Sequence, residues 1–274
     1  MRAVWLIAKS VLVEAVRRKE IYAVILAATG VILIAGTIRF FGYEGMSKFY
    51  REVSLKIMNL ATALTVIFLA ARQLPREFES KTIYPLLAKP VGRWTFLMGK
   101  VLGVLLAGSF CYGLFILLFA GGMKYIGADL EWDLFIQAVY LQLLALSMLA
   151  GAAFLLSLLL NVDAAVTVTV LLFALGGTLS SALDYTYDSI RAALPFTVPW
   201  VGGAWSTSVG EILMRLLNYT IPQFSLFDLS SKVVHGNKWG PVGGWVIGYL
   251  TLYALVFLSI YLFLAYQLFR RRPL

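Results

Sequence analysis

The chain has 274 residues, of which 61% are hydrophobic and only 14% are charged, and its mean hydropathy is +0.85. A soluble domain would be about one-quarter charged, so the composition excludes that class and predicts a polytopic membrane protein. The net charge of +9 is not gathered on a solvated basic domain, which argues against nucleic-acid binding. The single Cys excludes an internal disulfide and a multi-Cys metal site, and the single His excludes bis-histidine haem ligation.

Residues 1–20 have the pattern of an amphipathic interfacial helix. At about 100° per residue, Ala8, Val11 and Ala15 share an apolar face, while Lys9 and Glu14 fall on the other side. A basic amphipathic helix of this kind lies in the plane of the lipid headgroups. The alternative is that this segment simply extends the first membrane span.

Six later runs are long and apolar enough to cross a bilayer, which takes about 20 residues. We therefore expect an all-α integral membrane protein with six transmembrane helices, forming a single membrane domain over residues 1–274. Only Asn161, Val162 and Asp163 separate the fourth run from the fifth, which predicts a tight polar turn. The runs are Ile21–Phe41, Val53–Ala71, Phe96–Gly122, Leu134–Leu160, Ala164–Leu183 and Trp245–Phe269.

The distribution of charge predicts the orientation of these spans. With six spans, both termini lie on the same side as the segment 75–100 and the 161–163 turn. That side then carries the entire net charge of +9, and the opposite side is neutral. By the positive-inside rule the charged side is cytoplasmic, so we expect a multi-pass protein of the cell (inner) membrane with both termini in the cytoplasm.

The longest polar break in the first two-thirds of the chain is the segment 75–100. Pro75 suits the first turn of a helix, and Glu77 and Glu79 would then fall where the helix dipole favours negative charge. Lys89 and Pro90 would end such a helix. The pattern predicts a short amphipathic helix over residues 75–90, lying across the membrane face.

A second large feature is the segment 184–244 on the other side. It is too long for a plain loop and too apolar for a disordered one. A helical pattern over Ser206–Tyr219, interrupted on both sides by prolines, predicts short helices on the outer membrane face. The functional interpretation is a lid or gate over a translocation path, and the alternative is an inert cap that anchors the fifth and sixth spans. The candidate gate residues are Pro195, Trp200, Trp205, Pro222 and Phe224.

Motifs for chemistry within the chain are missing. The sequence has no phosphate-binding G-x-x-x-x-G-K-[ST] loop, no H-E-x-x-H zinc motif and no G-x-S-x-G elbow, so we expect no metal or catalytic residues in it. Charges within the spans would indicate an ion relay, but Lys56, Arg39 and Arg72 lie near span ends, where their side chains reach the interface. If this protein moves a solute, its energy comes from another chain.

Small residues recur every four positions in the third run, at Gly99, Gly103, Ala107 and Cys111. Such a stripe lets two helices approach closely. The partner helix is either in the same chain or in a second copy.

The segment from Glu77 to Lys100 resembles the signature of ABC type-2 permeases, the membrane halves of exporters whose ATPase is a separate chain. The residues that match are acidic at the start, then two leucines, a Lys-Pro pair, an arginine and a Gly-Lys pair: Glu77, Glu79, Leu86, Leu87, Lys89, Pro90, Arg93, Gly99 and Lys100. Lys81 stands where the family usually has Gly. The resemblance also covers the N-terminal amphipathic helix, the six spans, the outer segment and the basic tail.

This resemblance implies that the 75–90 helix is a coupling helix that docks into a cleft of a cytoplasmic P-loop ATPase. It implies two ATPase copies, which bind ATP and Mg, and a second copy of this permease or a related one. The 161–163 turn would be a minor contact. The residues implied in coupling are Glu77, Phe78, Glu79, Thr82, Leu86, Leu87, Pro90 and Arg93.

The function we expect is that of a permease subunit of an ATP-driven exporter, which is not itself an enzyme. One alternative is a non-transporting membrane subunit that anchors another complex. A second is a secondary carrier, which the lack of charges within the spans argues against. Neither the substrate nor the choice between a homodimer and a heterodimer follows from the sequence.

Overall fold

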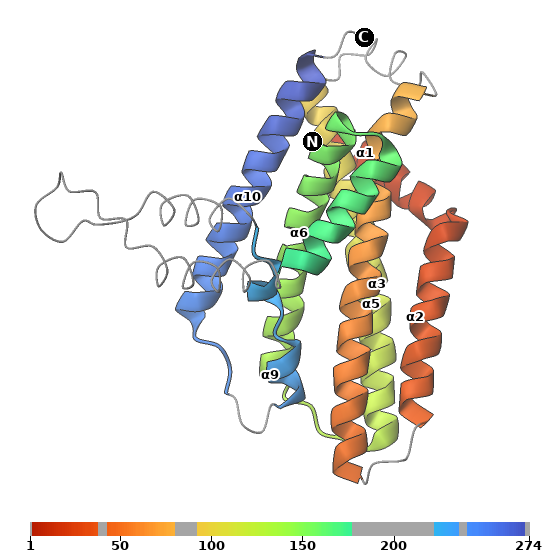
Figure 1. Cartoon of the computed structure of the whole chain (residues 1–274), viewed down its shortest axis with the longest axis vertical. Coiled ribbons are helices and arrows are strands. Elements are labelled where there is room, and N and C mark those ends of the chain that lie inside the picture. Colours follow the sequence, from red (N-terminus) through yellow and green to blue (C-terminus); the bar gives the residue numbers. More distant parts are fainter. Residues whose placement is uncertain (1, 38–42, 80–91, 177–221, 236–239, 272–274) are drawn as a thin grey trace, which may run out of the picture. The chain divides into compact units, whose positions relative to one another are not determined.

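The computed structural model describes residues 2–37, 43–79, 92–176, 222–235 and 240–271. Nearly all of these residues are helical, and the described ranges contain no strand. Five helices within them are long and apolar enough to cross a membrane, so the protein is an all-α integral membrane protein (Figure 1). These helices are α2 (Lys19–Thr37), α3 (Tyr43–Glu79), α5 (Arg93–Ile126), α6 (Trp132–Leu159) and α10 (Gly244–Arg271).

The helix bounds confirm most of the predicted spans. Helices α2, α5, α6 and α10 correspond to the predicted first, third, fourth and last spans. A shorter apolar helix, Val162–Gly176, begins where the fifth span was predicted, and the rest of that predicted span lies outside the described residues. The total of six spans therefore stays a prediction.

Helix α3 differs from the prediction at its C-terminal end. It runs through Pro75 to Glu79, so the prediction that a separate helix starts at Pro75 is wrong. Glu77 consequently lies at the C-terminal end of a long helix, where the helix dipole disfavours negative charge. A carboxylate in that position needs a nearby cation. The rest of the predicted 75–90 helix lies outside the described residues.

The described residues divide into two compact units, one formed by residues 1–170 with 227–274 and the other by residues 171–226. In the smaller unit, two of the predicted gate residues are visible. Phe224 is buried and its ring centroid lies 6.1 Å from that of Phe173. Pro222 is also buried, with its carbonyl oxygen beside Gly176. Both residues therefore pack against the end of the helix Val162–Gly176.

In the larger unit, helix α1 (Arg2–Val16) packs against the N-terminal half of α5. Ala8, Val11 and Ala15 form its buried face, as the amphipathic pattern predicted. A Cβ atom on Gly103 would lie 2.5 Å from the Cβ of Val11, and one on Gly99 would meet Ile7 at 2.8 Å. These two glycines of the small-residue stripe therefore serve packing within the chain.

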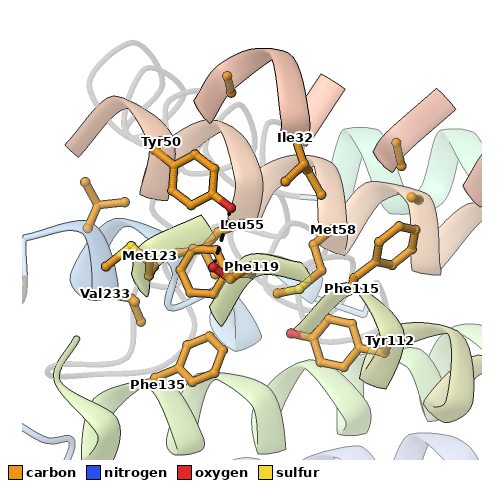
Figure 2. Close-up of a cluster of buried hydrophobic side chains, with 14 of the residues drawn as sticks. Ile32, Tyr50, Leu55, Met58, Tyr112, Phe115, Phe119, Met123, Phe135 and Val233 are labelled. Atoms are coloured by element: carbon orange, nitrogen blue, oxygen red, sulfur yellow. Dashed lines mark hydrogen bonds between the residues drawn. The ribbon is translucent and has the colours of Figure 1, made fainter. Parts of the chain in front are cut away.

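The apolar core of the larger unit lies between α2, α3, α5, α6 and the short helix α9 (Ser230–Val234) (Figure 2). The rings of Tyr50 and Phe119 stack with an interplanar angle of 1°, and Phe119 also stacks on Phe135. The Tyr50 hydroxyl donates a hydrogen bond of 3.4 Å to the Phe119 carbonyl. This aromatic cluster locks α3, α5 and α6 together at the end remote from residues 80–91.

Polar side chains fix α9 and the segment before α10 onto this core. Asn59 in α3 donates a hydrogen bond to Ser230 at the start of α9 and accepts one from Tyr112 in α5. Gln137 in α6 exchanges two hydrogen bonds with the backbone of Val242. Each of these polar side chains thus has a partner, which the low-dielectric surroundings require.

Candidate functional site

The candidate site lies where α3 ends and α5 begins, on either side of residues 80–91. We call this end of the larger unit the charged end. Its central residue is Lys100, whose side chain is only 5% exposed. The Lys100 ammonium donates hydrogen bonds to Glu77 at 2.6 Å and to Gln73 at 3.0 Å, and it lies 5.6 Å from the centre of the Phe96 ring. A buried ammonium group needs such partners, because burial removes the water that would otherwise hydrate it.

The network continues from α5 through α3 to α1. Gln73, which accepts from Lys100, donates a hydrogen bond of 3.4 Å to Glu14 in α1. Glu14 also accepts bonds of 2.6 Å from Arg18 and from Arg76. Helices α1, α3 and α5 are therefore joined by one network of charged groups and Gln73, whose members stabilise one another in the low-dielectric site.

Glu14 has a lowered pKa because of this network. Burial alone would raise the pKa of the Glu14 carboxyl, but the hydrogen bond and positive charge of Arg18, supported by Lys100 and Gln73, outweigh that effect. The pKa of Glu14 therefore lies below its ordinary value of 4.5. The carboxylate form is the one that holds α1 against α3.

The lowered pKa predicts a loss of stability in acid. The stabilisation is fully present above the ordinary pKa of 4.5 and is lost as the pH falls through the lower pKa of the folded state. We expect the thermal midpoint of the purified protein, followed from about pH 7 to about pH 3, to fall less steeply in Glu14→Gln than in the unsubstituted chain. Asp133→Asn, at the exposed start of α6, is the matched control and should keep the steep fall. If the thermal midpoint of Glu14→Gln fell as steeply as that of the unsubstituted chain, Glu14 would not be the source of the acid sensitivity.

Both flanks of residues 80–91 also contact the C-terminal end of α10. The Phe78 ring packs edge-on against Phe269, with 5.9 Å between the ring centroids. From the α5 side, Arg93 donates hydrogen bonds to the carbonyls of Phe269 and Arg270, at 3.4 Å and 2.7 Å. The last carbonyls of a helix lack intrahelical donors, so the Arg93 guanidinium satisfies and electrostatically complements them.

The structure thus brings together three of the predicted coupling residues: Glu77, Phe78 and Arg93. Each is engaged by contacts within the chain, so together they form a rigid base for residues 80–91. Glu79 is the last residue of α3, and its side chain lies outside the described residues. The remaining predicted coupling residues and three of the gate residues also lie outside the described part: Thr82, Leu86, Leu87, Pro90, Pro195, Trp200 and Trp205.

Sequence reasoning missed the residues that hold this base. Lys100 was assigned to the polar boundary, but it is buried within α5. A signal for it was present, since Lys100 follows apolar residues of the third run and needs a counter-charge there. Gln73 and Glu14 carry no comparable signal, because their partners are set by the packing of α1 on α5. Arg72, which the sequence placed near a span end, pairs with Glu20.

The described residues contain no group of three or more His, Cys, Asp or Glu side chains that could hold a metal ion. The site is a set of ion pairs and hydrogen bonds that joins α1, α3, α5 and α10 next to residues 80–91. We call this set of contacts the joint.

The described residues thus form an all-helical, multi-pass membrane protein with a charged, hydrogen-bonded joint at one end. The family model described as ABC-2 family transporter protein matches residues 11–274. Because the match covers almost the whole chain, the chain belongs to this family and is a permease component of an ABC transporter. It is a membrane transport subunit. A search of curated proteins found no match.

Proposed function

We propose that this chain is the permease subunit of an ATP-driven exporter and that residues 80–91 receive the movement of a separate cytoplasmic P-loop ATPase. The single observation that carries the proposal is the joint at the base of this segment. Glu77 on one flank is fixed to Lys100, and Arg93 on the other flank is fixed to the end of α10. A push on residues 80–91 is thereby delivered to α1, α3, α5 and α10 together.

The proposal assigns different roles to the coupling residues. Glu77, Phe78 and Arg93 position the segment, because their side chains are taken by contacts within the chain. Glu79 and the residues Thr82, Leu86, Leu87 and Pro90 are left to contact the ATPase. Two ATPases would bind ATP and Mg, and a second permease, identical or related, would complete the path. The charged end then faces the cytoplasm, as the positive-inside rule expects for a protein of the cell membrane.

The outer segment keeps its proposed role as a gate, with Pro195, Trp200, Trp205, Pro222 and Phe224 as candidates. The packing of Phe224 on Phe173 provides a firm attachment for one end of that segment. Movement of the helix Val162–Gly176 would therefore carry that end of the outer segment with it.

Co-purification tests the proposal. The tagged full chain is extracted from its native membrane in mild detergent, and the preparation is examined for a P-loop ATPase in stoichiometric amount. We expect the ATPase to be retained by the unsubstituted chain and to fall about tenfold or more in Glu79→Lys combined with Leu86→Asp, since docking residues of this kind often dominate binding.

Glu131→Lys is the matched control. Glu131 is exposed in the connection between α5 and α6, at the opposite end of α3 from Glu79. Reversing the charge of Glu131 should leave the ATPase bound. Retention of the ATPase by the Glu79/Leu86 variant would refute docking through this segment. A preparation that contains another assembly and no ATPase would instead favour an anchoring subunit.

A further inference from the structure

Two cavities adjoin the turn between α1 and α2. The first has a volume of about 500 Å³, and its lining includes Arg18, Lys19, Glu20, Arg72, Arg76 and Asp163. The second is an apolar groove of about 120 Å³, with Ala15, Val16, Ile21, Tyr22, Leu69 and Phe110 among the residues that line it. Lys100 lines neither cavity, although Arg18 and Arg76 of the first cavity also bond to Glu14 in the network around Lys100.

The two cavities are neighbours along α3. Leu69 lines the apolar groove, and Arg72 and Arg76, three and seven residues later on the same helix face, line the polar cavity. Since a helix rises 1.5 Å per residue, Leu69 and Arg72 are separated by roughly 4.5 Å along the axis. The turn between α1 and α2 shows the same order, with Val16 in the groove and Arg18 in the polar cavity.

The polar cavity has an excess of positive charge. Its lining has four cations, Arg18, Lys19, Arg72 and Arg76, against two carboxylates. Glu20 is already paired with Arg72, and Arg18 and Arg76 are paired with Glu14, which does not line the cavity. Among the described residues, Lys19 has no ion-pair partner, and the buried Nε of Arg18 has no hydrogen-bond acceptor. A buried donor of this kind indicates a missing acceptor.

We propose that these two cavities form one binding site for an anionic phospholipid. The phosphate lies in the polar cavity, where Arg18, Lys19 and Arg72 provide charge-assisted hydrogen bonds. The first part of an acyl chain lies in the groove beside Leu69 and Phe110, and Tyr22 lies at the boundary between the two. A free phosphate satisfies only the cations, whereas a lipid also covers the apolar groove that adjoins them.

The test is a lipid titration of the purified full chain followed by native mass spectrometry. Phosphatidylglycerol and phosphatidylcholine are added separately, and inorganic phosphate and glycerol phosphate are added as competitors. We expect phosphatidylglycerol to bind more tightly than phosphatidylcholine. Lys19→Gln should weaken phosphatidylglycerol binding about fivefold, the effect expected for one cation at an anionic lipid surface.

Lys48→Gln is the matched control, because Lys48 is exposed at the opposite end of α3 and undergoes the same change of charge. It should leave the affinity unchanged. Val16→Trp fills the groove at a half-exposed position and should weaken lipid binding but not the binding of inorganic phosphate. Equal affinities for Lys19→Gln and Lys48→Gln would overturn the proposal. So would full competition by inorganic phosphate with no effect of Val16→Trp, which would identify a site for free phosphate. The thermal midpoint of each variant confirms that it is folded.

Discussion

Lys100→Met is expected to lower the stability of the protein by about 3–5 kcal/mol, the range for removing one partner of a buried ion pair. The Lys100 side chain is 5% exposed and that of Glu77 is 20% exposed, so neither charge is well hydrated. Without the ammonium group, the Glu77 carboxylate is left at the C-terminal end of α3, where the helix dipole also disfavours it. The measurement is the thermal midpoint of the purified chain in mild detergent.

Two further variants separate the charge effect from the loss of a long side chain. Adding Glu77→Gln to Lys100→Met removes the uncompensated carboxylate and should recover part of the lost stability. Lys124→Met, at the exposed end of the same helix, should change the midpoint little. If Lys100→Met and Lys124→Met gave the same midpoint, the buried network would have no structural importance.

Gly103→Ala is expected to loosen α1 from α5. The added Cβ would lie 2.5 Å from the Cβ of Val11 and 2.9 Å from the backbone oxygen of Ala8, so the two helices must separate. Overpacking of this kind costs about 1–3 kcal/mol. We expect a lower thermal midpoint and faster tryptic cleavage at Arg17 and Arg18, which follow α1. The movement would also withdraw Glu14 from Arg76.

Gly113→Ala provides the matched control for this substitution. Gly113 lies in the same helix, but a Cβ there meets no atom within 4 Å. It should leave both the thermal midpoint and the cleavage rate close to their original values. Equal cleavage rates for the two glycine variants would show that α1 is not held by this contact.

The sequence predicted the fold well wherever an apolar run has the length of a bilayer. Helices α5, α6 and α10 begin and end within a few residues of the predicted spans, because hydrocarbon thickness limits both. The end of helix α3 was harder to predict, since its last two turns extend beyond the apolar run. There Pro75 and the charges that follow it look like the start of a new helix. The tertiary contacts of Gln73 and Glu77 keep the chain helical instead.

The site was only half predictable for a related reason. Glu77, Phe78 and Arg93 stand out in sequence because they are polar or aromatic residues beside long apolar runs. Of the residues that hold them, only Lys100 has a signal in the sequence, as a lysine within an apolar run. Glu14 and Phe269 do not stand out, because their contacts are set by how the helices pack. Glu14 and Arg76 are 62 positions apart, and no local period relates them.

The attachment of Arg93 to the end of α10 affects the order in which contacts form while the protein is being synthesised. The two residues joined by this contact, Arg93 and Phe269, are 176 positions apart, and the second is almost at the end of the chain. At about 5–20 residues per second, a ribosome needs roughly 10–35 seconds to make the intervening sequence. Helices α1, α3 and α5 can join through Lys100 early in that interval, but Arg93 and Phe78 must wait for the last helix. These contacts therefore form only after α10 has been made, so a chain cut short before α10 lacks the packing that holds Phe78 and Arg93.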